Sequence, residues 1–265
     1  MAVLRSKRQL AKTEFENTFA TLYNEVKRYT LAIPRRRQKW LCKEVNKLMN
    51  QVYREVVEVN DYYHVDKATR IEHCKQMAST AIGHLYDLEK PMMVMWNVQR
   101  FDTDKIGRLV ELFNREIGLL NKINKYTERD DGFMMLDWHA VNNAEFLKTM
   151  SALHRYTHGK VASARMDYDD TSGALLIQAV DDALFCVMKA NRKIPTNRKE
   201  YEKRRENISR AIMCLKEMNR YLLSYFNLQR YSERVMNEWT MLLTQEQKLL
   251  YAIQSSDKKR FGKLS

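Results

Sequence analysis

The sequence has few of the residues that interrupt helices: its 265 residues include seven glycines and three prolines. Tight turns are therefore scarce and long helices are favoured. No stretch approaches the roughly 18 uninterrupted apolar residues of a membrane span. A Gly-rich phosphate loop and a G-x-S-x-G motif are also absent, and the first eight residues have too little apolar content for a signal peptide.

Cysteine is also sparse, with four residues at positions 42, 74, 186 and 214. They form no CxxC pair, and their spacing is not typical of metal ligands. This predicts buried free thiols in a reducing, cytoplasmic setting and no cofactor.

What the sequence does contain is an internal repeat. Residues 97–101 (Asn-Val-Gln-Arg-Phe) fall on residues 227–231 (Asn-Leu-Gln-Arg-Tyr) at an offset of 130. Earlier in each half the offset is 131, where Glu14-Phe15 falls on Glu145-Phe146. A period this long indicates a duplicated domain, because solenoid repeats run about 20–50 residues. The polar matches support the duplication, since a helical core does not dictate Asn-x-Gln-Arg.

Apolar residues in both halves recur at helical spacings, and strand patterns are absent. Asp66, Asp102, Thr196 and Ser232 are predicted N-caps, in pairs 130 residues apart. We expect helices near 13–32, 37–60, 66–96, 102–127, 143–158, 174–191, 197–226 and 231–257. Four amphipathic helices with short loops pack most simply as an antiparallel bundle. The sequence therefore predicts an all-α chain of two tandem antiparallel four-helix bundles related by internal duplication, at residues 1–130 and 131–265.

The formal net charge is +13, and both halves contribute, with +7 from residues 1–130 and +6 from residues 131–265. A basic folded domain favours a polyanionic partner, nucleic acid before membrane. The candidate nucleic-acid-binding residues form four clusters: Arg5, Lys7, Arg8 and Lys12; Arg35, Arg36, Arg37 and Lys39; Lys193, Arg198, Lys199, Lys203, Arg204 and Arg205; and Lys258, Lys259 and Arg260, with Lys263 beyond.

Each cluster alone is equally compatible with a solvated helix face, but the four together favour RNA or DNA. Tyr201, Tyr168 and Trp40 lie near these clusters and are candidates to stack on unpaired bases. Replacing Arg35, Arg36 and Arg37 with Ala is expected to weaken RNA binding and flatten its dependence on salt.

Two features of the repeat have two interpretations each. Arg100 and Arg230 follow the repeated Asn-x-Gln. Either they contact a partner protein or phosphate, or they belong to a turn whose side chains satisfy the backbone groups at a helix end. We favour the turn. The loop at 33–40 is basic while its counterpart at 165–173 is acidic. Either the two halves have taken different functions, or the loop sequences have drifted apart at a surface that tolerates change.

Catalytic and metal patterns are weak. His154 and His158 are four residues apart and share a helix face, but the neighbouring sequence supplies no further ligand, so we expect an ordinary surface or interface pair and no metal. Helical-bundle ribonucleases use an Arg and a His at a wider spacing than the nearest pairs here, Arg70–His73 and Arg155–His158. We therefore expect no enzymatic activity.

Residues 3–8 (Val-Leu-Arg-Ser-Lys-Arg) and 11–15 (Ala-Lys-Thr-Glu-Phe) carry a family resemblance. This opening resembles the accessory variability determinant proteins, which are small basic four-helix bundles encoded beside reverse transcriptases in diversity-generating retroelements. The resemblance covers about the first 130 residues directly and the second half through the repeat.

The resemblance implies a non-catalytic protein that binds a reverse transcriptase and its template RNA and supports error-prone cDNA synthesis. Members of the family form positively charged rings. This chain departs from them by fusing two bundles, so a homo-oligomer, a pseudo-symmetric ring or a new stoichiometry are all open. The second half lacks the basic loop, so protein contacts are an alternative there. Two other functions remain: a helical scaffold for an acidic protein, and a helical nuclease dependent on His154 or His158.

Overall fold

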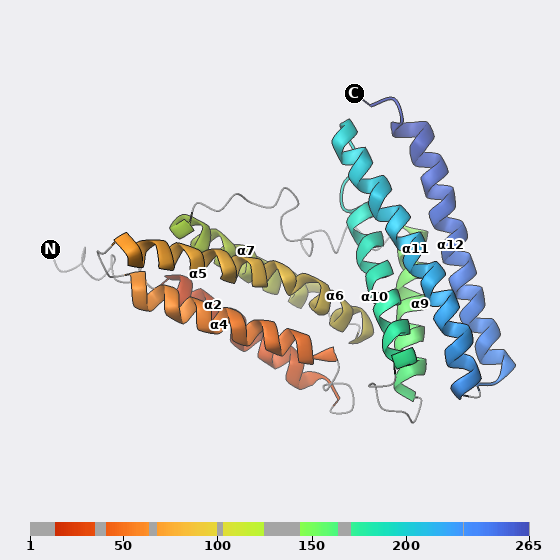
Figure 1. Cartoon of the computed structure of the whole chain (residues 1–265), viewed down its shortest axis with the longest axis horizontal. Helices are drawn as coiled ribbons and strands as arrows, with labels where there is room; N and C mark the ends of the chain where they lie inside the picture. The colour runs from red at the N-terminus through yellow and green to blue at the C-terminus, as the bar shows by residue number, and fades with distance from the viewer. Residues whose placement is uncertain are drawn as a thin grey trace. The chain divides into compact units, whose positions relative to one another are not determined.

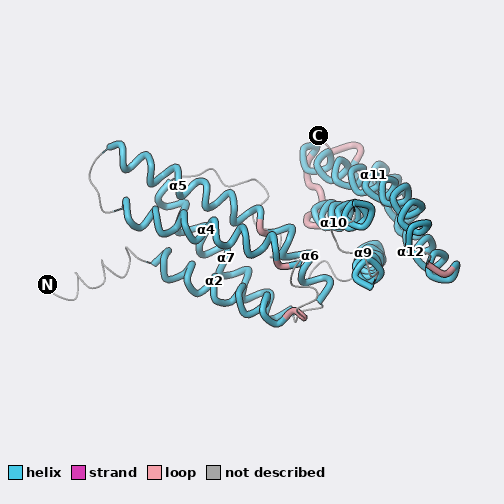
Figure 2. The backbone as a smooth tube through the Cα atoms, turned by 60° about the horizontal axis from the view of Figure 1, so that its bottom comes forward, coloured by secondary structure: helices cyan, strands magenta, loops and turns pink. Residues whose placement is uncertain are grey.

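The computed structural model describes residues 14–34, 41–63, 68–99, 103–124, 144–163, 171–229 and 231–264. Within these ranges the chain consists of helices and short loops, without strands (Figure 2). The all-α prediction is confirmed. Every helix in the described ranges is too short or too polar to span a membrane.

The chain divides into two compact units, Met1–Leu136 and Asp137–Ser265. The first unit contains α2 (Glu14–Ala32), α4 (Lys43–Tyr63), α5 (Ala68–Asp87), α6 (Glu89–Gln99) and α7 (Thr103–Asn124), as Figure 1 shows. Helix α2 packs against α4 and α7, and α5 packs against the same two helices, so four helices enclose one core. Phe19, Leu22, Ile82 and Phe113 are fully buried in it.

The second unit contains α9 (Glu145–Ser163), α10 (Thr171–Asn191), α11 (Arg198–Gln229) and α12 (Glu233–Phe261). Each helix packs against two others in the cycle α9, α10, α11, α12. Leu153, Leu215, Trp239 and Leu250 lie in the core with at most 1% of their surface exposed.

Several repeat-related leucines are buried in both units. Leu22 and Leu153, which are 131 residues apart, are both fully buried. So are Leu120 and Leu250, which are 130 apart. These leucines therefore occupy core positions in both units, as an internal duplication predicts.

The predicted single helix over 66–96 is wrong, because the structure breaks it at Leu88 into α5 and α6. Pro91 explains the break, since proline has no N–H to donate to the carbonyl of Asp87 and its ring crowds that carbonyl. The equivalent residue of the second unit is Tyr221, and α11 runs through that position without interruption.

Candidate nucleic-acid interface

Two basic segments that are distant in the sequence meet at one end of the second unit. Helix α11 begins where α12 ends, so the start of one helix lies beside the C-terminal turn of the other (Figure 1). The Nη1 atom of Arg198 donates to the carbonyl of Gly262 at 3.5 Å, across 64 residues of sequence. The rings of Tyr201 and Phe261 pack with their centroids 6.4 Å apart. We call the surface formed by residues 193–210 and 257–263 the basic end.

The basic end concentrates the positive charge of its half of the chain. It contains eleven Lys and Arg residues against four Asp and Glu residues, a formal charge of +7. Residues 131–265 as a whole carry +6, so the rest of that half is nearly neutral. The charge of the second half is therefore localised, and a localised field attracts a polyanion more strongly than a dispersed one.

A capping arrangement fixes the first turn of α11. Asn197 Oδ1 accepts from the backbone N–H of Glu200 at 3.0 Å, which makes Asn197 the N-cap, so the prediction of Thr196 is wrong by one residue. The Glu200 carboxylate accepts in return from the backbone N–H and the hydroxyl of Thr196, both at 2.8 Å. Lys193 also donates to this carboxylate, and the hydrogen bonds from Lys193 and Thr196 lower the pKa of Glu200 to about 2.

Two of the predicted contact residues have structural roles instead. The Arg204 side chain is only 13% exposed, and its guanidinium donates to the Asp257 carboxylate and the Ala190 carbonyl. The Tyr201 side chain is buried against Phe261, so it is not exposed to stack on a base. We therefore remove both residues from the candidate interface. The error arose because consecutive basic residues on a helix face different directions, and sequence clustering ignores this.

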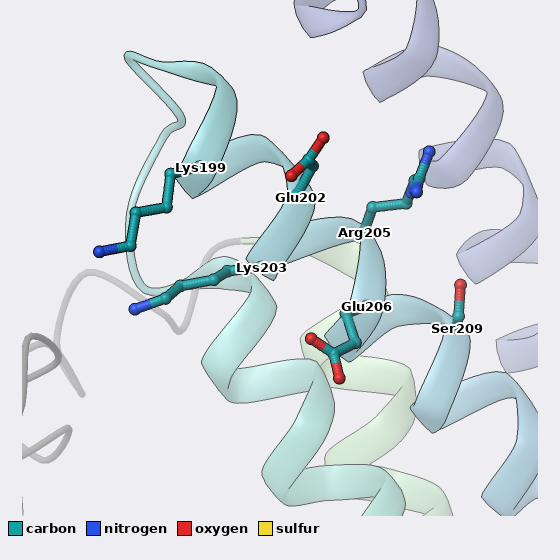
Figure 3. Close-up of a pocket in the computed structure, with 6 residues that line it drawn as sticks. All are labelled: Lys199, Glu202, Lys203, Arg205, Glu206 and Ser209. Carbon is teal, nitrogen blue, oxygen red and sulfur yellow. The ribbon is translucent and has the colours of Figure 1, made fainter.

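The remaining basic side chains lie at the surface. Lys199, Lys203 and Arg205 border a shallow open pocket, together with Glu202, Glu206 and Ser209 (Figure 3). Lys199 and Lys203 project in the same direction in this view, whereas Arg205 lies on the side of α11 nearer α12. Lys258, Lys259 and Arg260 are exposed at the end of α12. Arg198 is exposed as well and pairs with Glu202 at 2.7 Å.

The other predicted contacts belong to segments outside the described ranges. The clusters at 5–12 and 35–39, the aromatic residues Trp40 and Tyr168, and the repeated Arg100 and Arg230 lie outside the described residues. So do the predicted N-caps Asp66 and Asp102. Ser232 is the N-cap of α12, as predicted, although its side chain makes no capping hydrogen bond.

The prediction of His154 and His158 as a surface or interface pair is wrong. Both are buried, with side chains 0% and 1% exposed, and both direct Nε2 to the same Oδ1 atom of Asp181, at 2.8 and 2.7 Å. Burial and the neighbouring His158 lower the pKa of His154 to about 4. Burial alone would raise the pKa of Asp181, but the two imidazoles hold it well below its usual range. Asp181 was missed because it lies on α10, and no local spacing connects it to α9.

Two buried glutamates were also missed. Glu116 on α7 and Glu246 on α12 are fully buried, and none of their carboxylate oxygens has a hydrogen-bond partner among the described residues. Burial raises the pKa of Glu116 to about 9 and that of Glu246 to about 8. The signal was present in the sequence, since the two residues are 130 apart and each lies on the apolar stripe of its helix.

All four cysteines are free, and Cys42 and Cys74 are buried. Burial raises the pKa of the Cys42 thiol to about 11. Burial raises the pKa of the Cys74 thiol as well, so neither of these two buried cysteines offers a reactive thiolate near neutral pH. The basic end is therefore the most distinctive candidate surface. No family model, curated protein or solved structure matches this chain.

Proposed function

We propose that this chain is a non-catalytic RNA-binding protein that assists a reverse transcriptase of a retroelement. The basic end supports the RNA-binding part, because it gathers +7 of formal charge at one end of a helical bundle. The opening at residues 3–15, with its resemblance to accessory variability determinant proteins, supports the polymerase part. Such a protein would act in the cytoplasm, beside the polymerase.

The position of these charges is the observation that carries the proposal. Cations are unfavourable at the N-terminus of a helix, where the helix dipole is already positive. Arg198 and Lys199 occupy the first two positions of α11, where Glu200 is the only acidic residue of the first turn. The helix dipole therefore does not favour these residues, whereas a phosphate ligand would benefit from both the side chains and the helix terminus.

The three basic residues in the last turn of α12 differ in this respect. Lys258, Lys259 and Arg260 lie at a helix C-terminus, where cations offset the negative end of the dipole. They contribute to the field of the basic end, but helix stability alone accounts for their presence. The basic residues that distinguish RNA binding from helix stabilisation are therefore those of α11.

The mechanism in this proposal is electrostatic. Lys and Arg side chains neutralise phosphates along the RNA backbone with little preference for sequence. A rigid helical bundle holds these cations in a fixed arrangement, so it can present RNA to a polymerase bound elsewhere on the oligomer. The chain would assemble into a homo-oligomer or a pseudo-symmetric ring, in which each of its two units occupies one subunit position.

The test is affinity purification of the tagged chain from cells carrying its native locus, with sequencing of bound RNA and identification of bound proteins. The test variant is Lys199→Ala/Lys203→Ala/Arg205→Ala. The control, Lys216→Ala/Arg220→Ala/Lys248→Ala, removes the same charge from exposed positions outside the basic end.

We expect a reverse transcriptase and one RNA from the locus with the wild type and the control, and loss of the RNA with the test variant. Wild-type protein that carries neither would contradict the proposal and favour a scaffold for an acidic protein. RNA retained in full by the test variant would remove the basic end from the interface.

A further inference from the structure

The second unit brings together three metal-ligand side chains in its interior. His154 and His158 lie one turn apart on α9, and Asp181 lies opposite them on α10. One ligand atom from each of these residues lies within 4.8 Å of the other two. The imidazole rings are tilted by 39° with centroids 4.4 Å apart, and both Nε2 atoms are directed to Asp181 Oδ1.

The equivalent place in the first unit shows that the fold does not require these residues. At an offset of 131, Tyr23 corresponds to His154, Lys27 to His158 and Asn50 to Asp181. There, Tyr23 Oη donates to Asn50 Oδ1 at 3.1 Å, and this neutral pair joins α2 to α4. A single neutral hydrogen bond is therefore sufficient at this position. The second unit instead has three residues that can each ligate a metal ion.

We propose that His154, His158 and Asp181 bind one divalent transition-metal ion, with zinc the best fit. Two imidazole nitrogens and one carboxylate oxygen form a borderline-soft donor set that suits zinc. Three protein ligands leave a fourth position for water. The proposal concerns a site separate from the basic end and does not depend on the proposed function.

Coordination of an ion requires the three side chains to adjust, since their ligand atoms lie within 4.8 Å of one another. Ligand atoms around tetrahedral zinc lie about 3.3 Å apart, given metal–ligand distances of about 2.0–2.1 Å. The two Nε2–Oδ1 separations are 2.8 and 2.7 Å, so a small rotation of the Asp181 side chain opens the space. On coordination each imidazole carries its proton on Nδ1 and presents Nε2 to the ion. The Asp181 side chain is 16% exposed, which provides a path for the ion and a place for the fourth ligand.

The surrounding packing holds the histidines in place. Thr157 lies between them on α9, donates to the Leu153 carbonyl at 2.9 Å and accepts from Trp239 Nε1 at 2.9 Å. This ties the histidine-bearing turn of α9 to α12. A ligand-bearing turn fixed in this way loses little freedom on binding the ion.

The experiment titrates the full-length chain, free of any polyhistidine tag and stripped with a chelator, with Co²⁺ as a spectroscopic probe and then with Zn²⁺. The variants are Asp181→Asn, which preserves the side-chain shape, and His158→Gln. The matched control is His84→Gln, because His84 pairs with Glu55 at 2.8 Å in a more exposed position of the first unit. Circular dichroism checks that each variant is folded.

We expect one Co²⁺ per wild-type chain, visible d–d bands that Zn²⁺ removes, and a Tm raised by about 5 °C or more at saturating Zn²⁺. Affinity falls at least about tenfold in Asp181→Asn and His158→Gln and is unchanged in His84→Gln. A wild-type chain without Co²⁺ bands or a Tm shift would overturn the proposal and leave a hydrogen-bonded cluster. Equal binding by folded Asp181→Asn would overturn it as well, since the ion would then bind elsewhere.

Discussion

Arg204 donates from Nε to the Asp257 carboxylate, and this ion pair joins the start of α11 to the end of α12. Both side chains are largely buried, at 13% and 6% exposure. The pair therefore holds together the two segments that form the basic end.

Removing one partner leaves a buried charge without its counter-ion, so we expect Asp257→Ala to destabilise the second unit by about 3 kcal/mol. The exposed pair Arg210–Glu206 is the control, and Arg210→Ala should change stability by less than about 1 kcal/mol. Hydrogen exchange in α11 and α12 measures both effects. Equal protection of α11 and α12 from hydrogen exchange in the two variants would show that the buried ion pair stabilises the unit no more than the exposed pair does.

Glu246 makes the second unit less stable as the pH rises. Its pKa is about 8 in the folded chain against an ordinary 4.5, so the stabilising effect of the neutral form is complete below pH 4.5 and is lost between pH 4.5 and 8. Glu246→Gln keeps the shape of the neutral acid but cannot ionise. We expect this variant to match the wild type near pH 4 and to exceed its stability by about 3 kcal/mol at pH 7.

Urea unfolding across this pH range, with hydrogen exchange to locate the effect in α12, measures the difference. Glu116→Gln should act in the same direction in α7, over a window that extends to about pH 9. Glu206→Gln, at an exposed position, is the control and should show no such trend. A stability difference for Glu246→Gln that does not vary with pH would contradict the account.

The cysteines should differ in reactivity. Cys42 is buried and its pKa is raised to about 11, so little thiolate forms at pH 8, whereas Cys186 and Cys214 are half-buried. We expect iodoacetamide to modify Cys186 and Cys214 before Cys42 in the native chain, with all four reacting in denaturant. Mass spectrometry of peptides after timed labelling gives the order. Early modification of Cys42 would show that the segment just before α4 opens readily.

The helices of this chain could be predicted from its sequence because apolar spacing and few glycines specify them locally. The break at Leu88 was missed although Pro91 was visible, because a proline near a helix end is compatible with several local structures. Thr196 and Asn197 are both good capping residues, and only the hydrogen bond to Glu200 decides between them.

The candidate site was harder to predict because it depends on which helices are neighbours. Sequence clustering identified Lys199 and Lys258 but not their convergence at one end of the second unit, which follows from the pairing of α11 with α12. It also included Arg204, whose direction on the helix only the packing against α12 reveals. Asp181 joins His154 for the same reason, through the contact of α10 with α9.

The most direct test of the basic end as an RNA-binding surface is the salt dependence of RNA affinity. An RNA transcribed from the native locus is titrated with the wild type, with Lys199→Ala/Lys203→Ala/Arg205→Ala and with the control Lys216→Ala/Arg220→Ala/Lys248→Ala. We expect the slope of log Kobs against log salt to be shallower by about 2 in the first variant and unchanged in the control. An unchanged slope in the basic-end variant would contradict this expectation.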